Sequence, residues 1–187
     1  MKGFTFGTMG NASKDPPSVA AATYGVTSRH ADNDEVRMTS DEKTTRPRIA
    51  IANTPEEIRR CHSVMRELRP LFPEPEQFVE RVLRQQKEGY QLGFLESEGE
   101  VCAVAGYRFL ESLFSGKFLY VDDLVTREDT RSRGFGGELL DWLIEQAREH
   151  GCENLELDSG VQRFEAHRFY FSKRMSISSY HFRIKID

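Results

Sequence analysis

The chain has 187 residues, of which 38% are hydrophobic and 30% are charged, and this is enough to bury one sizeable core but not two. Its formal net charge of −4 argues against binding to a nucleic-acid backbone, which requires a basic face. The sequence shows no CxxC pair among its three cysteines, no signal-peptide pattern and no run of about 20 apolar residues, so we expect a reduced, cytoplasmic protein that does not enter a membrane.

Residues 1–46 differ in composition from the rest of the chain. They are rich in Ser, Thr, Ala, Gly, Asp and Pro, and their apolar residues follow neither the period of a strand nor that of a helix. Such a segment cannot bury enough apolar surface to offset the entropy lost on ordering. We therefore expect a disordered N-terminal extension over residues 1–46 and a single folded domain over residues 47–187.

The folded domain is predicted to begin with a short strand and two helices. Residues 48–52, RIAIA, alternate in the manner of a strand. The run TPEE at residues 54–57 supplies an N-cap, a proline at the first helical position and a capping-box glutamate, and the helix that it opens is expected to stop before Pro70. A second helix is expected to follow Pro75 and to end near Gly89.

Three strands are predicted next, at residues 90–97, 101–110 and 117–126, and the short connections between them indicate an antiparallel meander. The pattern that follows predicts a helix from Phe135 to near Gly151, and then a strand, a helix and a last strand at residues 155–159, 163–174 and 176–186. This order predicts an α+β fold, with a mixed, mostly antiparallel central sheet flanked by helices, rather than a doubly wound parallel sheet.

The loop before the helix at Phe135 carries three glycines in the run RSRGFGG at residues 131–137. A Walker P-loop needs Lys and then Ser or Thr after its last glycine, and a Rossmann fingerprint needs Gly or Ala three places after its second glycine. Glu138 and Leu139 exclude both patterns. Glycine lets a backbone come close to a ligand, and free N–H groups at a helix start favour an anion such as a pyrophosphate.

The remaining pattern, Arg131-x-x-Gly134-x-Gly136, resembles the acetyl-coenzyme A signature of the Gcn5-related N-acetyltransferase (GNAT) family, Gln/Arg-x-x-Gly-x-Gly/Ala. Two further features agree with it. A strand ends in LVT at residues 124–126 before the loop, and Ala166-x-x-Phe169-Tyr170 lies on the next helix. The resemblance extends over residues 48–186 and implies the acyl-CoA N-acyltransferase (GNAT) fold and acyltransferase activity.

The resemblance also implies how the donor substrate, acetyl-coenzyme A, is bound. The main chain of the central strand would pair with the pantetheine arm, and the backbone of the loop would hold the pyrophosphate. These roles fall on Leu124, Val125 and Thr126 for pantetheine, and on Arg131, Ser132, Arg133, Gly134, Phe135, Gly136 and Gly137 for the pyrophosphate. The histidines and cysteines show no metal-ligand spacing, so no metal is expected.

Direct transfer of an acetyl group to an amine requires a base for the ammonium and an acid for the departing thiolate. The resemblance assigns the acid to Tyr170. For the base, the predicted strand offers Asp122 and Asp123, two carboxylates that are costly to bury without a reason. Because successive side chains of a strand point to opposite faces, we expect them to enter different clefts and Asp122 to share the face of Leu124. Asp122 is therefore the preferred base, and Asp123 replaces it if a bulge shifts the register.

The sequence thus predicts an N-acetyltransferase that acts on a primary amine of a small molecule or a protein. The alternative is a non-catalytic acyl-coenzyme A binding or regulatory module in which the base is absent. Arg66 or Arg69 suits an acceptor carboxylate, whereas Asp122, Asp123 and Glu111 suit a cationic amine. The last predicted strand would leave an exposed edge, which the second subunit of a homodimer is one candidate to cover.

Two positions depart from the family pattern. Arg174 occupies the place of a glycine that follows the tyrosine helix, which predicts a different exit from that helix. Arg163 occupies a place where many members have asparagine. No role is carried over to either residue.

Overall fold

The computed structural model describes residues 46–186, so the extension expected over residues 1–46 lies, apart from Arg46, outside the described residues. The elements of the described part are β1 (Arg48–Ile51), α1 (Pro55–Leu68), α2 (Pro75–Gln86), β2 (Gln91–Ser97), β3 (Glu100–Ser112), β4 (Gly116–Thr126), a short 3-10 helix (Glu128–Thr130), α3 (Phe135–Glu149), β5 (Asn154–Leu157) and α4 (Phe164–Ser172). None of these helices is both long and apolar enough to cross a membrane.

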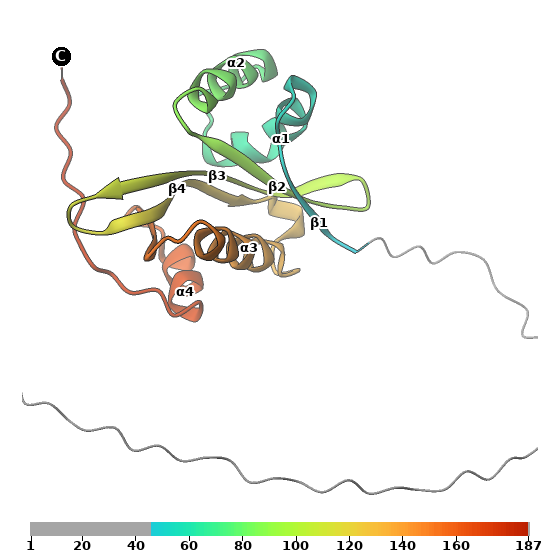
Figure 1. Ribbon diagram of the computed structural model, residues 1–187. Helices are drawn as coiled ribbons and strands as arrows, with labels where there is room; N and C mark the ends of the chain where they lie inside the picture. The colour runs from blue at the N-terminus through green and yellow to red at the C-terminus, as the bar shows by residue number, and fades with distance from the viewer. Residues whose placement is uncertain (1–45, 187) are drawn as a thin grey trace, which may run out of the picture. The chain divides into compact units, whose positions relative to one another are not determined.

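The five strands lie in one sheet in the order β1-β2-β3-β4-β5. The first four are antiparallel to their neighbours, and β5 runs parallel to β4. In the view of Figure 1, α1 and α2 lie above the sheet, and α3 and α4 lie below it. The expected fold class, an α+β fold with a mixed, mostly antiparallel sheet flanked by helices, is confirmed.

Local signals in the sequence explain where α1 begins and where β2 turns into β3. The Glu57 amide donates to Thr54 Oγ1 at 3.3 Å, and the Glu57 carboxylate accepts from the amide of Thr54 at 3.0 Å, so the predicted capping box is present. At the turn, Glu98 and Gly99 have φ angles of 57° and 84°. Both are left-handed, as the two central residues of a tight hairpin turn require.

Apolar side chains form a core on each face of the sheet. The upper core joins α1 and α2 to the sheet around Ile58 and Val82. The lower core joins α3 to the sheet around Leu139 and Leu143. Neighbouring strand residues enter different cores, as Phe94 and Leu95 do, because side chains alternate along a strand. The sheet is therefore buried on both faces.

At its centre, β4 has one residue more than its partner β3. Tyr107 lies opposite Val121 and Gly106 lies opposite Asp123, which leaves Asp122 as the extra residue of a β-bulge. A bulge of one residue shifts the alternation of the strand by one place. From Asp123 onwards, each side chain of β4 therefore lies on the opposite face of the sheet from the one it would take in a regular strand.

Beyond the bulge, β4 and β5 diverge. Their last paired residues are Val121 and Leu157, whereas β4 stays paired with β3 as far as Thr126. From Asp122 to Thr126, β4 thus has no strand neighbour among residues 46–186 on the side of β5. An extended ligand that pairs with a strand edge needs such an opening.

The prediction of a last strand at residues 176–186 is wrong, since these residues belong to no helix or strand. They follow α4, which ends in a Schellman motif. The amide of Arg174 donates to the Phe171 carbonyl at 2.9 Å, and that of Met175 donates to the Tyr170 carbonyl at 3.1 Å. The apolar alternation of residues 176–186 fits a strand, but a strand also needs a neighbour for its backbone hydrogen bonds. No edge within the described residues supplies one.

Candidate active site

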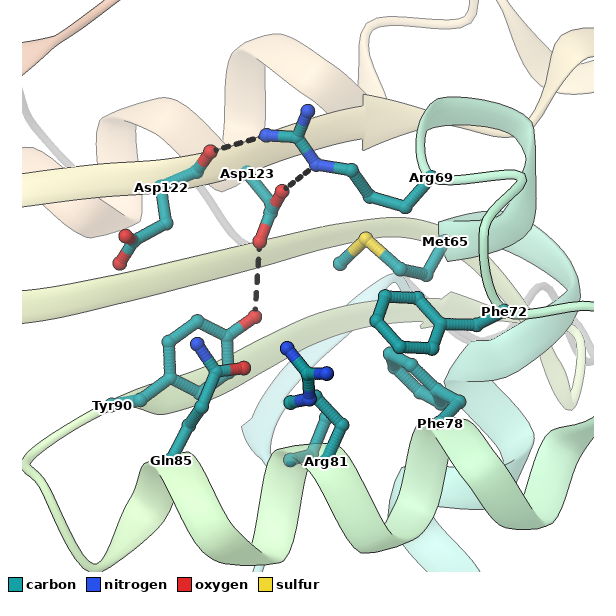
Figure 2. A pocket seen from close by; sticks show the side chains of 10 residues that line it. Met65, Arg69, Phe72, Phe78, Arg81, Gln85, Tyr90, Asp122 and Asp123 are labelled. Atoms are coloured by element: carbon teal, nitrogen blue, oxygen red, sulfur yellow. Dashed lines mark hydrogen bonds and ion pairs between the residues drawn. The ribbon is translucent and has the colours of Figure 1, made fainter. Parts of the chain in front are cut away.

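Two cavities meet beside the bulge in β4. The larger cavity, of about 610 Å³, lies where β4 and β5 diverge, and its lining includes Val121, Asp122, Leu124, Leu157, Tyr170 and Arg183. We call it the strand-gap cavity. The smaller cavity, of about 240 Å³, lies between β4 and the helices α1 and α2, and its lining includes Met65, Arg69, Phe78, Arg81, Asp122 and Asp123 (Figure 2). We call it the helix cavity. Asp122 and Arg69 line both cavities.

Asp122 forms an ion pair in a mostly buried place. Arg108 Nε donates to Asp122 Oδ2 at 2.9 Å, and the two side chains are 20% and 27% exposed respectively. Burial raises the pKa of Asp122, and the hydrogen bond from Arg108 opposes this rise. A carboxylate with a raised pKa is a better-matched base near neutral pH than an ordinary aspartate.

Asp123 is held by two donors on the side of the helix cavity. It accepts hydrogen bonds from Arg69 Nε at 2.6 Å and from the Tyr90 hydroxyl at 3.2 Å. Arg69 Nη2 also donates to the main-chain oxygen of Asp122 at 3.0 Å, as Figure 2 shows. Arg69 directly follows α1, so these bonds tie the end of that helix to the bulge and fix the orientation of Asp123.

Tyr90 connects the two ion pairs and requires a glycine beside it. Its hydroxyl bonds Asp123, and the Arg108 guanidinium lies 5.3 Å from the centre of its ring. A Cβ atom on Gly106 would collide with this ring, which is 3% exposed. Burial, and next the charge of Asp123, raises the pKa of Tyr90 well above its usual value. The hydroxyl therefore stays protonated and donates to Asp123.

Both carboxylates line the helix cavity, so the expectation that they enter different clefts is wrong. The bulge is the physical reason, because it inserts Asp122 without a ladder partner and shifts the alternation from Asp123 onwards. Leu124 packs against the lower core, and it lines the strand-gap cavity together with Asp122. The sequence favours Asp123 as base if a bulge shifts the register, and this bulge is present. Both carboxylates stay candidate bases.

Tyr170 lies on α4 and lines the strand-gap cavity together with Asp122 and Leu124. Its neighbour Phe169 packs against the lower core, and the ring centres of Phe169 and Tyr170 lie 5.5 Å apart. Burial raises the pKa of Tyr170, and the charge of Arg163, which lines the same cavity, opposes this rise. The phenol is protonated at neutral pH, as a general acid must be before it gives up its proton.

The glycine-rich loop opens α3 without a side-chain cap. Gly134 is the N-cap residue, with φ of 92°, and it has no side chain that could cap the first turn. The first internal bond runs from the Glu138 amide to the Gly134 carbonyl at 3.0 Å. The amides of Phe135, Gly136 and Gly137 precede that bond and are available to an anion.

Gly136 also sits close to the central strand. A Cβ atom at this position would lie 2.6 Å from Thr126 Oγ1, so the start of α3 packs directly on the end of β4. This contact brings the loop backbone next to Leu124, Val125 and Thr126, the strand residues that face the gap to β5. The residues expected to bind coenzyme A are thus contiguous in the structure.

The two arginines of the loop are engaged in other contacts. Arg131 Nη2 lies 3.3 Å from the Glu67 carboxylate, and its Nε donates to the Thr126 carbonyl at 3.4 Å. Arg133 places its guanidinium 4.9 Å from the centre of the Phe135 ring. A role for either guanidinium in phosphate binding stays a prediction, and the backbone offers the more direct cradle. Ser132 adopts a left-handed φ of 67° within the same loop.

The sequence did not single out two residues of this site, Tyr90 and Arg108. A single arginine within the otherwise apolar stretch of β3 is a usable signal for Arg108, but its pairing with Asp122 depends on the bulge. The candidates Arg66 and Glu111 line neither cavity. Among residues 46–186, no group of three or more His, Cys, Asp or Glu side chains is placed to hold a metal ion.

Comparison with known proteins points to acetyltransferases. Residues 57–175 match the model of the Acetyltransferase (GNAT) family. An uncharacterized N-acetyltransferase of Bacillus subtilis is 41% identical over 99 residues, which are 52% of this chain and 70% of that protein. An aminoalkylphosphonate N-acetyltransferase of Salmonella typhimurium is 38% identical over 63 residues, or 34% of this chain and 40% of that protein. The fold is similar to the solved structure of a ribosomal-protein-alanine N-acetyltransferase from Brucella melitensis, with a TM-score of 0.66 and 16% identity over 76% of this chain and 100% of the other.

Proposed function

Because the chain belongs to the Acetyltransferase (GNAT) family, we propose that it transfers the acetyl group of acetyl-coenzyme A to a primary amine by direct attack on the thioester. The observation that carries this proposal is the strand-gap cavity. There the open edge of β4, one candidate base and the candidate acid line one space, through Leu124, Asp122 and Tyr170. A direct transfer needs these three parts around one reacting carbon.

For the donor, we propose that Leu124, Val125 and Thr126 pair with the pantetheine arm, since no strand of the described part of the chain neighbours β4 on that side. The pyrophosphate would then lie on the amides that open α3, after the left-handed Gly134. The close packing of Gly136 on Thr126 supports this assignment, because it places the two binding segments side by side.

In the proposed reaction, the Asp122 carboxylate accepts a proton from the acceptor ammonium, directly or through a water, and the amine nitrogen then attacks the thioester carbon. The carbon–nitrogen bond forms, the carbon–sulfur bond breaks, and the nitrogen, which carries one proton too many after the attack, releases it to water. Tyr170 gives its hydroxyl proton to the departing sulfur and regains a proton from water. Asp123 stays the alternative base, and its two donors, Arg69 and Tyr90, hold it more firmly than Arg108 alone holds Asp122.

For the acceptor, we propose entry through the helix cavity, where Asp122 and Asp123 attract an ammonium group. Its volume of about 240 Å³ suits a small amine or the end of a lysine side chain. Arg81, which lines the same cavity and lies 5.3 Å from the centre of the Phe72 ring, offers a partner for an anionic group on the acceptor. The phosphonate in the name of the Salmonella relative is an anion of this kind.

A second candidate function is a non-catalytic acyl-coenzyme A binding or regulatory module. The engagement of both carboxylates in ion pairs, Asp122 with Arg108 and Asp123 with Arg69, favours it. For Asp122, the hydrogen bond from Arg108 opposes the rise in pKa that burial causes, and so weakens this carboxylate as a base. Binding of acetyl-coenzyme A without turnover is the result that this second function predicts.

The test combines calorimetric binding of acetyl-coenzyme A with thiol release on a panel of amines that includes amino acids, aminophosphonates, polyamines and peptides. We expect binding and turnover in the wild-type chain. Tyr170→Phe is expected to lower kcat by about 100-fold and to leave the Kd of acetyl-coenzyme A unchanged, because only proton transfer is lost.

Tyr120→Phe is the matched control, since Tyr120 donates to Asp158 at 2.8 Å and lines neither cavity. This variant is expected to keep full turnover. An equal loss of kcat and of affinity in Tyr170→Phe would count against the acid role. No turnover on any amine despite binding would favour the regulatory module, and no binding at all would exclude both functions.

A further inference from the structure

The helix that carries the candidate acid is only loosely covered by apolar packing. None of the residues of α4 is fully buried, and Phe164 and Phe171 on it are 69% and 54% exposed. Phe169 on α4 and Met175 after it pack against the lower core. A helix with few buried apolar contacts shifts easily, and a catalytic group that is misplaced by about 1 Å loses about 100-fold in rate. The position of Tyr170 therefore requires a further restraint.

Lys173, the C-cap residue of α4, connects this helix to α3. In Figure 1 both helices lie below the sheet. The Nζ atom of Lys173 donates to the Gly137 carbonyl at 3.3 Å and to the two carboxylate oxygens of Asp141 at 2.8 and 2.7 Å. A Cβ atom on Gly137 would lie 3.4 Å from this Nζ atom, so the end of the lysine side chain lies against the first turn of α3. That turn carries the amides proposed to hold the pyrophosphate.

The contacts of Lys173 leave its ammonium group no free donor. An ammonium has three N–H groups, and the three oxygens of Gly137 and Asp141 accept one each. The Lys173 side chain is 25% exposed, and that of Asp141 is 61% exposed. An ion pair with so exposed a partner contributes little to global stability, because water screens the charges. Its effect is therefore geometric, since it fixes the end of α4 against α3.

We propose that Lys173 is a positioning residue, which holds α4 on the first turn of α3 and so fixes the Tyr170 hydroxyl relative to the bound donor. This inference rests on the proposed function, in which Tyr170 is the acid and the first turn of α3 binds the pyrophosphate. Lys173 follows Tyr170 by three residues, a spacing that places both on one face of the helix. It lines neither cavity, so it acts through Tyr170 and not on a substrate.

The test uses the full chain with Lys173→Met, which keeps the length of the side chain and removes its three donors. We expect kcat to fall about 10-fold on the amine of the panel that is acetylated fastest, with the Kd of acetyl-coenzyme A and the urea midpoint unchanged. In a chain that already carries Tyr170→Phe, the same change is expected to cause no further loss, because no acid is left to position. Lys173→Arg keeps a cation for Asp141 and is expected to recover most of the rate.

Arg168→Met is the matched control on the same helix. Arg168 is 78% exposed and pairs with Glu165 at 2.9 Å within α4, so this variant loses a cation but no contact with α3. It is expected to keep full turnover. An equal loss of kcat from Lys173→Met with and without Tyr170→Phe would overturn the proposal, because it would show an effect that does not pass through Tyr170.

Hydrogen exchange measures the attachment of α4 without any substrate. The amides of residues 168–172 are expected to exchange faster in Lys173→Met than in the wild-type chain, while those of α3 keep their rates. A wild-type chain without turnover on any amine would contradict the proposed function. Unchanged exchange in α4 of Lys173→Met would overturn the role of Lys173, whatever the turnover.

Discussion

Asp122 is itself the extra residue of the bulge in β4, and this position determines its surroundings. A regular strand would place Asp122 and Asp123 on opposite faces, whereas the bulge lets both line the helix cavity. Each carboxylate then has its own arginine, Arg108 for Asp122 and Arg69 for Asp123. Two adjacent carboxylates in a largely buried strand are tolerable because each charge is paired.

The role of Asp122 as base can be tested by the pH dependence of turnover. Burial raises the pKa of Asp122 above its usual value of 3.8, and a base must be deprotonated to act. We therefore expect kcat/KM to rise with pH through a pKa above 3.8. Asp122→Asn is expected to lower kcat by about 100-fold or more and to remove this acid limb from the pH profile.

Asp123→Asn is the matched variant, with the same change one residue away. If Asp122 is the base, Asp123→Asn keeps the acid limb and loses less activity. The reverse pattern, with the acid limb lost only in Asp123→Asn, would move the role of base to Asp123.

The ring of Tyr90 leaves no room for a side chain at Gly106. Gly106→Ala places a methyl group against the buried ring of Tyr90, where neither the strand nor the ring can move freely. We expect a loss of about 1–3 kcal/mol in the free energy of unfolding, measured by urea denaturation. Gly160→Ala is the control, because its added atom meets only the end of the Gln162 side chain, and it is expected to be nearly neutral. An unchanged midpoint for Gly106→Ala would show that β3 shifts to make room.

Among the helices, α4 has the least usual ending. Its C-cap is Lys173, and the left-handed residue after it is Arg174, with φ of 62°. Glycine is the common residue in this place, because a side chain there costs about 1–2 kcal/mol. The different helix exit that Arg174 predicted is thus absent, and the arginine adopts the conformation that glycine would supply.

Arg174→Gly is therefore expected to stabilise the protein by about 0.5–1 kcal/mol, since the relief of strain exceeds the entropy that glycine loses on folding. Arg174→Ala removes the same long side chain and keeps the Cβ atom, so it is expected to give no gain. Denaturation midpoints of the two variants separate the backbone effect from the side-chain effect. Equal midpoints would mean that the conformation of Arg174 carries no strain.

Elements that depend on local chemistry were predictable from the sequence, and those that depend on distant partners were not. The capping box at Thr54 and the turn at Gly99 are set by a few neighbouring residues, and both are confirmed. The loop at Gly134 led to the correct family for the same reason. The bulge at Asp122 depends on β3 and on Tyr90, which are distant in the sequence. The strand expected at residues 176–186 has the right alternation, but alternation does not provide a neighbouring strand.

Residues 46–186 pack around two cores, and each core contains a buried cysteine whose labelling reports on its unfolding. Cys61 lies in the upper core at 0% exposure, and Cys102 lies in the lower core at 2% exposure. Burial raises the pKa of Cys61 to about 12, so its thiol is unreactive in the folded state. Cys152 is only half-buried and borders the lower core.

Pulse labelling with an alkylating reagent, read by mass spectrometry, is expected to modify only Cys152 in the folded protein. As urea is raised, Cys61 and Cys102 are expected to become labelled over the same concentration range, because a single domain of this size unfolds cooperatively. Cys152→Ser provides the control in which the native protein takes up no label. Labelling of Cys61 at clearly lower urea than Cys102 would show that α1 and α2 separate from the sheet before the rest unfolds.

The strand-gap cavity and the helix cavity share two lining residues. Asp122 and Arg69 line both cavities, so the two cavities are adjacent. The described residues that line the two cavities include no cysteine, serine or lysine, the usual carriers of an acyl group in covalent catalysis. Under the proposed function, donor and acceptor would form a ternary complex in which the acetyl group passes directly between them, without a ping-pong cycle.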